Sequence, residues 1–225
     1  EIAQCLVGSE MCIRDRVDPY NRVCRLEYEN DNKEVFYGSA AIVGNPRIAI
    51  TAAHCVFDDD NNNKPYKNWK IQPGYSDGEL SGTQTGWDRV YYSSNWMNSG
   101  SNNYDWAICV LQADASDYAL GAYAYFENAD MLDLPVTVYG YPGDIRYGYI
   151  EGADYQFMSG DKITQVDDTT FRYTAYTVGG FSGGPVLRDS DNSIIGVHVA
   201  GNDSGGKSAA VRFNTEMANI VLSLM

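Results

Sequence analysis

Short runs of β-branched and aromatic residues alternate with turn residues along most of the chain. The runs recur at about ten-residue intervals between Gly, Pro, Asn and Asp, a pattern typical of an all-β protein. The expected strands are Val35–Val43, Arg47–Thr51, Trp87–Tyr92, Trp106–Leu111, Leu134–Tyr141, Phe171–Tyr176, Ser193–Val199 and Ser208–Phe213. The residues between the first two, Gly44-Asn45-Pro46, favour a tight turn, so these strands are predicted to form a hairpin.

The last element has a helical period instead. Asn214 or Thr215 can cap its start. Its apolar residues recur at i, i+3, i+4 and i+7: Met217, Ile220, Val221 and Leu224. We therefore expect two packed six-stranded antiparallel β-barrels and a C-terminal α-helix whose apolar stripe lies on the second barrel.

The chain divides into five expected segments. Residues 1–16 fit nothing downstream, and within them no apolar stretch has the length of a signal peptide. We interpret them as a sequence artefact, a pro-segment or a disordered leader outside the fold. The other segments are an N-terminal barrel over 17–111, a connector over 112–125, a C-terminal barrel over 126–213 and a helix over 214–225.

Composition and net charge limit the kinds of molecule that the protein is expected to bind. The chain has 225 residues, of which 44% are hydrophobic and 20% charged, and this excludes wholesale disorder. Its apolar runs are shorter than a membrane-spanning helix needs. The net charge of −14 disfavours nucleic acids and anionic membranes, so we expect a monomer that acts on proteins or peptides.

The cysteines do not identify a redox compartment. They stand at positions 5, 12, 24, 55 and 109, an odd number with neither a CxxC pair nor zinc-ligand spacing. At least one is therefore free or bonded to another molecule.

Three segments carry residues with catalytic chemistry. His54 lies in the string TAAHC, directly after an apolar strand. Ser182 lies in the string GGFSGGP. The glycines of this second string permit a turn in which the amides of Gly180 and Ser182 point into one concavity. Asp105 opens the apolar run DWAICVL, where a partly buried carboxylate needs a partner. Taken alone, each has a structural interpretation: a core histidine, an incidental serine and a solvated aspartate. Three other aspartates lack this lead into an apolar strand: Asp88, Asp114 and Asp117.

Together these segments resemble the chymotrypsin-like serine proteases, from about residue 33 to the C-terminus. The resemblance implies that Ser182 is the nucleophile, His54 its general base and Asp105 the residue that orients the base. It also implies that the amides of Gly180 and Ser182 form the oxyanion hole. This chemistry requires neither a metal nor an organic cofactor.

Within this family the chain looks most like bacterial glutamyl endopeptidases. The strings TVGGFS, IGVHVAG and GYPGD carry this likeness. It implies that Thr177 and His198 bind the glutamate side chain of the substrate, since each offers a hydrogen-bond donor. The substrate backbone would pair with Val199, Ala200 and Gly201. The alternative for His198 is a buried core histidine.

Several features depart from the wider family or stay open. Tyr176 lies six positions before Ser182, where trypsin-like enzymes have the acid that selects Lys or Arg. Phe181 replaces the acid that receives a new N-terminus, and Ser39 replaces the cysteine that would bridge to Cys55.

Relatives are secreted, and the branch uses its mature N-terminal amine to neutralise the bound glutamate. We expect the same here, with Val17 as that residue.

Three alternatives remain at this stage. The same protease could have another cleavage preference, or the chain could be a catalytically silent homologue that serves as a binding module. Asp58–Asn63 has alternating oxygen ligands but not the Gly and Glu of an EF-hand, which leaves a looser surface calcium site as a third alternative.

Overall fold

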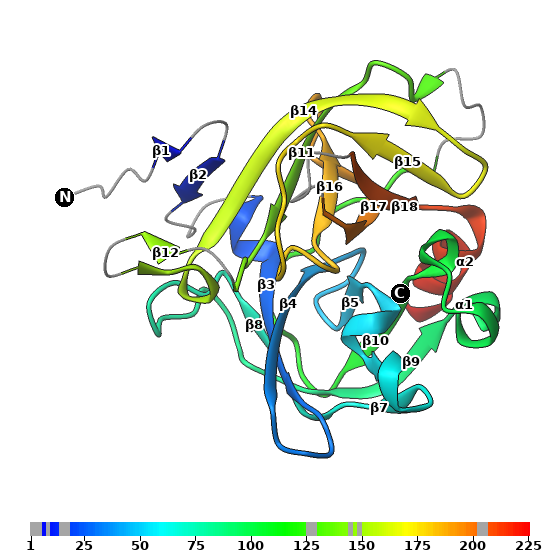
Figure 1. The fold of residues 1–225 in the computed structure, drawn as a ribbon. Coiled ribbons are helices and arrows are strands. Elements are labelled where there is room, and N and C mark those ends of the chain that lie inside the picture. The colour runs from blue at the N-terminus through cyan, green and yellow to red at the C-terminus, as the bar shows by residue number, and fades with distance from the viewer. Residues whose placement is uncertain are drawn as a thin grey trace.

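The structure is a computed structural model that describes residues 6–7, 10–13, 19–124, 130–143, 146–147, 150–201 and 207–225. Two large antiparallel sheets pack against each other, one formed mainly by the first half of the chain and one by the second (Figure 1). The fold is therefore mostly β, as the sequence predicts.

The first sheet is a curled half-barrel of six strands in the order β8-β3-β4-β5-β10-β9. Reciprocal backbone hydrogen bonds between Ile71 and Thr85 join β8 to the segment before β9 and curl the sheet. Its strands are β3 (Val23–Glu29), β4 (Val35–Ile42), β5 (Ile48–Thr51), β8 (Lys67–Pro73), β9 (Trp87–Tyr92) and β10 (Ala107–Leu111).

The second sheet closes into a barrel. Its order is β1-β2-β14-β11-β16-β17-β18-β15, and β14 also pairs with β15, so that six of the strands form a ring. The strands are β1 (Leu6–Val7), β2 (Glu10–Ile13), β11 (Pro135–Gly140), β14 (Gln156–Val166), β15 (Thr170–Tyr173), β16 (Pro185–Arg188), β17 (Ser193–Ala200) and β18 (Ser208–Arg212).

Short elements connect these strands. The helices are α1 (Ser94–Ser99) and α2 (Thr215–Leu224), and the 3₁₀ turns include η2 (Ala53–Cys55), η4 (Asn102–Tyr104) and η6 (Gly152–Asp154). Two small hairpins pair β6 (Phe57–Asp58) with β7 (Lys64–Pro65), and β12 (Arg146–Tyr147) with β13 (Ile150–Glu151).

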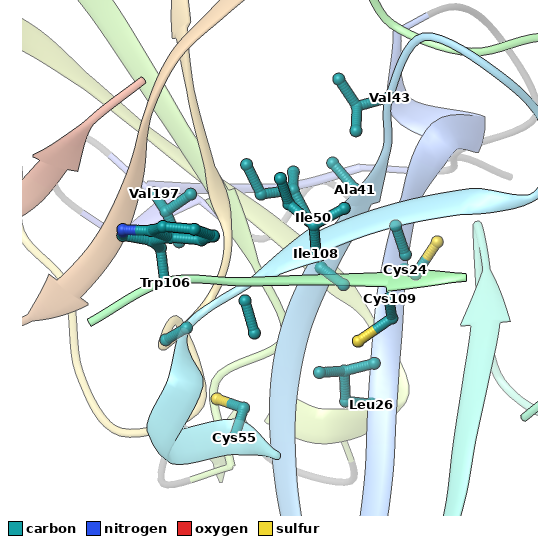
Figure 2. Close-up of a cluster of buried hydrophobic side chains, with 14 of the residues drawn as sticks. Cys24, Leu26, Ala41, Val43, Ile50, Cys55, Trp106, Ile108, Cys109 and Val197 are labelled. Carbon is teal, nitrogen blue, oxygen red and sulfur yellow. The ribbon is translucent and has the colours of Figure 1, made fainter. Parts of the chain in front are cut away.

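The main hydrophobic core contains side chains from both sheets. Ile50 and Ile108 come from the first sheet and Val197 from the second, and all three are fully buried beside Trp106 (Figure 2). Each such side chain contributes about 1.5–3 kcal/mol of burial free energy. The two halves therefore share one apolar cluster, which fixes the relative position of the loops that carry the predicted site.

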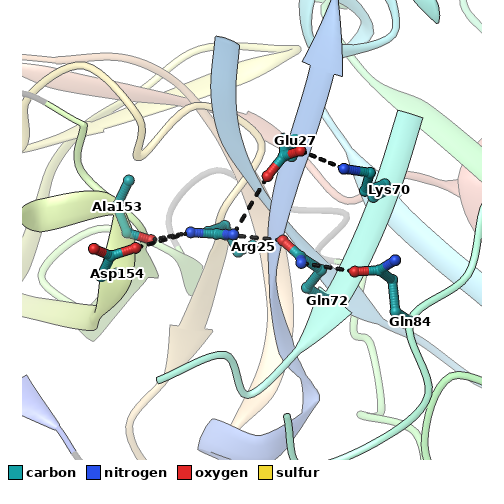
Figure 3. Close-up of polar contacts among 7 residues, drawn as sticks. All are labelled: Arg25, Glu27, Lys70, Gln72, Gln84, Ala153 and Asp154. Atoms are coloured by element: carbon teal, nitrogen blue, oxygen red, sulfur yellow. Dashed lines mark hydrogen bonds and ion pairs between the residues drawn. The ribbon is translucent and has the colours of Figure 1, made fainter. Parts of the chain in front are cut away.

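A polar cluster reinforces the same junction. Arg25 on β3 is 5% exposed, and its guanidinium donates to Gln72 on β8 and, in the second half, to the carbonyl of Ala153 and the carboxylate of Asp154, at 2.8, 3.2 and 3.1 Å (Figure 3). The guanidinium also lies over the ring of Tyr75, 3.4 Å from its centroid. A buried charge is costly unless it is paired, so these contacts stabilise this arrangement of the halves.

Each strand expected from the sequence is present within a few residues. The hairpin around Gly44 is confirmed, because Ala41 pairs with Ile50 and Gly44 has φ +68°. Three long strands, β3, β8 and β14, were not predicted. In β3 and β8 polar residues alternate with apolar ones, as in Leu26-Glu27-Tyr28-Glu29 and Trp69-Lys70-Ile71-Gln72, so the strand pattern is present and was overlooked, whereas β14 lacks a clear alternation.

The C-terminal helix begins as expected, since the Asn214 side chain accepts a hydrogen bond from the Met217 amide. The expectation for its packing is wrong. A Cβ added to Gly44 would lie 2.6 Å from Cγ1 of Val221, so α2 lies on the β4–β5 hairpin of the first sheet. The apolar residues Val43 and Leu120 beside that hairpin give the helix stripe an apolar surface.

Residues 10–13 also differ from the expectation that residues 1–16 stand outside the fold. Glu10–Ile13 pairs antiparallel with Gln156–Ser159 of β14 and extends the second sheet. Backbone pairing to a sheet edge requires no side-chain pattern, so the sequence gives no signal for it. The proposed mature N-terminus, Val17, lies outside the described residues.

Candidate active site

His54 and Asp105 meet in the first half of the molecule. His54 lies in η2, directly after β5, and Asp105 lies between η4 and β10. His54 Nδ1 is 2.5 Å from Asp105 Oδ2, and the His54 amide donates to Oδ1 at 3.0 Å. The two bonds fix both the backbone and the ring of His54. Among the four candidate aspartates, all of which are described, Asp105 is the one in contact with His54.

The environment of this pair adjusts the basicity of the imidazole. The Asp105 side chain is 1% exposed, whereas that of His54 is 27% exposed. Burial lowers the pKa of His54, but the charge of Asp105 and its hydrogen bond outweigh this, so the pKa lies well above 6.5. The ring therefore accepts a proton more readily than a free histidine does.

The Ser182 turn packs against the elements that hold His54. The Ser182 carbonyl accepts hydrogen bonds from the Ser39 amide at 2.8 Å and from Cys55 Sγ at 3.5 Å. Gly183 has φ +81°, and a Cβ added there would lie 2.0 Å from Thr51 Oγ1. A glycine is therefore required for this close approach, which brings the predicted nucleophile beside the residue that follows His54.

Two amides in the turn are left without acceptors among the described residues: those of Gly180 and Ser182. The carbonyl of Gly179 accepts from Gly143 at 2.9 Å, and that of Phe181 accepts from Gly184 at 2.8 Å. Because N–H and C=O point in opposite directions across a trans peptide, both amides point away from these internal partners. They are available to bind an anion.

Ser39 supports this turn, a role that the sequence analysis missed. Its hydroxyl donates to the Gly180 carbonyl at 2.7 Å and accepts from the Tyr141 amide at 2.8 Å. A side chain at the position of the family's bridging cysteine thus links β4 to the nucleophile turn by hydrogen bonds. Cys55 forms no disulfide, and neither do the described residues Cys24 and Cys109.

His198 occupies a second buried site, on β17. Its side chain contacts the Tyr173 hydroxyl of β15, with Nδ1 and the phenolic oxygen 2.6 Å apart. The carbonyl of His198 accepts from the Gly183 amide at 2.8 Å, so this strand is attached directly to the Ser182 turn. Burial, together with the nearby charge of His54, lowers the pKa of His198 to about 3, so the ring is neutral near pH 7.

Thr177 lies beside the end of the same strand. Its hydroxyl is buried and lies 2.9 Å from the hydroxyl of Ser208, which donates to the Ala175 carbonyl at 2.8 Å. A Cβ added to Gly201 would be 3.3 Å from Thr177 Oγ1. Tyr173 and Ser208 give no signal in the sequence, because each lies inside an ordinary strand pattern.

Of the predicted catalytic residues, His54 and Asp105 are in direct contact, and Ser182 lies close to them through its backbone. The Ser182 hydroxyl makes no hydrogen bond to His54 or to another described residue. Val199 and Ala200 continue β17 after His198, next to a register shift between His198 and Ala200. In the GYPGD string, Asp144 lies outside the described residues.

In the part of the chain that the structure describes, no group of three or more His, Cys, Asp or Glu side chains could hold a metal ion. No helix in that part is long and apolar enough to cross a membrane.

Comparisons with known proteins give the family and the fold. A family described as trypsin-like peptidase domain matches residues 38–197. The extracellular metalloprotease of Bacillus subtilis (strain 168) is 27% identical over 198 residues, which cover 83% of this chain and 58% of that protein. The chain therefore spans less than two thirds of this relative.

Solved structures share the fold. A Glu endopeptidase in complex with MPD has a TM-score of 0.83 at 19% identity, covering 98% of this chain and 99% of its own. The protease Anisep from Arthrobacter nicotinovorans has a TM-score of 0.75 at 17% identity, with coverage of 95% and 99%. The thermostable serine protease AL20 from an extremophilic microorganism has a TM-score of 0.74 at 19% identity, with coverage of 90% and 95%. The chain belongs to the family of trypsin-like serine peptidases.

Proposed function

We propose that the protein is a serine endopeptidase that cleaves peptide bonds after glutamate or aspartate. The observation that carries the proposal is the approach of the Ser182 turn to the buried His54–Asp105 pair. A tight glycine turn, a carboxylate-bound imidazole and two amides without an acceptor among the described residues are the parts that acyl transfer requires.

The reaction would proceed through an acyl-enzyme. His54 accepts the proton of Ser182 as the hydroxyl oxygen attacks the scissile carbonyl, and the amides of Gly180 and Ser182 bind the oxyanion. The same proton then passes to the leaving amine, and water repeats the sequence to release the acyl group. Asp105 holds the proton-bearing Nδ1 of His54, so that the other ring nitrogen serves as the base. Removal of one oxyanion donor costs about 2.7–4 kcal/mol in serine proteases.

Glutamate specificity is supported by the second buried site. His198 is attached to the nucleophile turn through Gly183, and Thr177 lies against Gly201 at the end of the same strand. We assign both side chains to binding of the substrate carboxylate, and the backbone of Val199, Ala200 and Gly201 to pairing with the substrate main chain. The similar solved structure of a Glu endopeptidase favours the same assignment.

Two properties accompany this activity in the proposal. The protein acts outside the cell, as the name of its Bacillus subtilis relative states for that protein, and it works as a monomer. It requires no cofactor, because the proposed chemistry uses only side chains and backbone amides.

A matched pair of peptides tests the proposal. The peptides differ only in Glu or Gln before the scissile bond, so that size and shape are kept while the charge is removed. We expect cleavage of the Glu peptide to be at least tenfold faster in kcat/KM, and cleavage of both to vanish in Ser182→Ala. Equal rates on the two peptides would contradict the specificity, and a fully active Ser182→Ala would contradict the mechanism. A folded wild-type protein without any cleavage would support a catalytically silent homologue instead.

A further inference from the structure

The hydroxyl of Tyr173 has one hydrogen-bond partner among the described residues, and that partner is Nδ1 of His198. We infer that Tyr173 is a specificity-determining positioning residue: it donates its phenolic proton to Nδ1 and thereby places the proton of the ring on Nε2, as a neutral donor for the substrate carboxylate. This inference rests on the proposed function, because it explains how the same site would recognise glutamate.

The hydrogen-bonding needs of the two side chains determine which of them donates in this hydrogen bond. Tyr173 is fully buried, and a buried hydroxyl hydrogen without an acceptor is costly. Among the described residues, Nδ1 of His198 is the acceptor within hydrogen-bond distance, so the hydroxyl hydrogen points to it. A neutral imidazole carries its proton on one nitrogen while the other accepts. With Nδ1 as the acceptor, the proton is on Nε2.

The surroundings of the ring favour the neutral form. Tyr173 faces it from β15, and burial keeps this phenol protonated by raising its pKa well above 10. Phe181 contributes an aromatic edge with ring centroids 6.3 Å apart, and Ala210 is the partner of His198 on β18. Among the described residues, the charged group that acts on the ring is His54, which opposes a second positive charge. A carboxylate that would stabilise a cationic His198 is absent from the described residues around it.

Nε2 is the atom left for the substrate. It makes no hydrogen bond to a described residue, whereas Nδ1 is occupied. Thr177 contributes less, because Ser208 already gives its proton to Ala175 and so takes the proton of Thr177 in their shared contact. Donation from Thr177 to a ligand would require Ser208 to turn away from Ala175. The preset donor is therefore His198.

A neutral donor has a distinct pH signature. If His198 had to be protonated, preference for glutamate would fade as the pH rises past the ordinary histidine range. With a neutral ring and Tyr173 as the proton donor, the ratio of kcat/KM for Glu and Gln peptides stays level from pH 6.5 to 9. The common dependence on His54 cancels in this ratio.

The test uses the full chain and its Tyr173→Phe variant, which removes the phenolic oxygen and keeps the ring. Tyr139→Phe is the matched control, since Tyr139 is a buried tyrosine of the same barrel and lies outside the site. We expect Tyr173→Phe to lower the Glu:Gln ratio by about three- to tenfold, as for loss of one hydrogen bond, because the charged Glu side chain depends more strongly on the donor than the neutral Gln side chain does. Tyr139→Phe keeps the wild-type ratio. A double variant, Tyr173→Phe with His198→Ala, should have the same ratio as His198→Ala alone.

Long-range ¹H–¹⁵N correlation spectra give a readout that does not depend on activity. The chain has two histidines, so the spectrum contains two imidazole patterns. For His198 we expect a protonated Nε2 and an unprotonated Nδ1. A protonated Nδ1, or an unchanged Glu:Gln ratio in folded Tyr173→Phe, would overturn the inference while the glutamate preference of the wild type stands. Absence of that preference in the wild type would overturn the proposed specificity itself.

Discussion

His54 and His198 are the same residue type in two different environments. His54 stands at the end of a strand, partly exposed, with a buried carboxylate on Nδ1. His198 lies within a strand, 1% exposed, with a phenol on Nδ1. The pKa of the first is raised above 6.5, whereas burial lowers that of the second to about 3.

The difference shows that the group on Nδ1 and the degree of burial decide what an imidazole can do. A carboxylate stabilises the cation that forms when His54 accepts a proton, which suits a base. A phenol in a dry site provides no such charge, which suits a neutral donor. The sequence shows two histidines near short strands; the distinction between them depends on Asp105 and Tyr173, which come from distant segments.

The largest expected effect comes from removing the charge beside His54. Asp105→Asn keeps the shape of the side chain but supplies an amide that favours the wrong tautomer of His54. The same change of the triad aspartate in a serine protease lowers kcat by about 10⁴. We expect a loss of that order with both Glu and Gln peptides, measured as kcat at saturating substrate. A loss confined to the Glu peptide would contradict the assignment of roles.

Removing the imidazole of the second site has a smaller and selective effect. His198→Ala deletes a hydrogen bond to a charged group, which is worth about 1.5–3 kcal/mol and corresponds to a roughly 10- to 150-fold lower kcat/KM on Glu peptides. The Gln peptide serves as the internal control and should change little. An equal loss on both peptides would show that His198 supports the fold and not the specificity.

A substitution at Ser39 tests whether its hydrogen bonds hold the Ser182 turn in place. Ser39→Ala leaves the Gly180 carbonyl and the Tyr141 amide without this partner, at a cost of about 1–3 kcal/mol. We expect kcat to fall on the order of tenfold for either peptide, since the amide of Gly180 loses its fixed orientation. Ser159→Ala is a matched control, because Ser159 is also fully buried and its hydroxyl makes no hydrogen bond among the described residues. Equal kcat values for the two variants would contradict a role for Ser39 in the turn.

The pH profile of the wild type tests the raised pKa of His54 without any substitution, and it is the smallest of these effects. His54 must be neutral to act as a base, and its folded pKa is raised, so kcat/KM should fall as the pH drops through a value above 6.5. The measurement is kcat/KM on the uncharged Gln peptide between pH 5 and 9. An activity that stays constant down to pH 5 would contradict the raised pKa of His54.

The sequence predicts most strands and points to the candidate catalytic segments because these signals are local. TAAHC and GGFSGGP are short strings, and their glycines and small residues reflect close backbone approaches that the structure contains at Gly183. The role of Ser39 could not be predicted, since its partner Gly180 is 141 positions away. Tyr173 gives no signal because it lies inside an ordinary strand pattern and its partner His198 is on another strand. The packing of α2 on the first sheet depends on tertiary contacts at Gly44 that helical periodicity does not encode.

Covalent labelling tests the central claim, that Ser182 is activated by the His54–Asp105 pair. The folded protein is incubated with a fluorophosphonate probe, digested and mapped by mass spectrometry, beside the Asp105→Asn variant. The account predicts a single modified serine, Ser182, and a much slower reaction in the variant. Labelling of another serine, or equal rates of labelling in the two proteins, would contradict it.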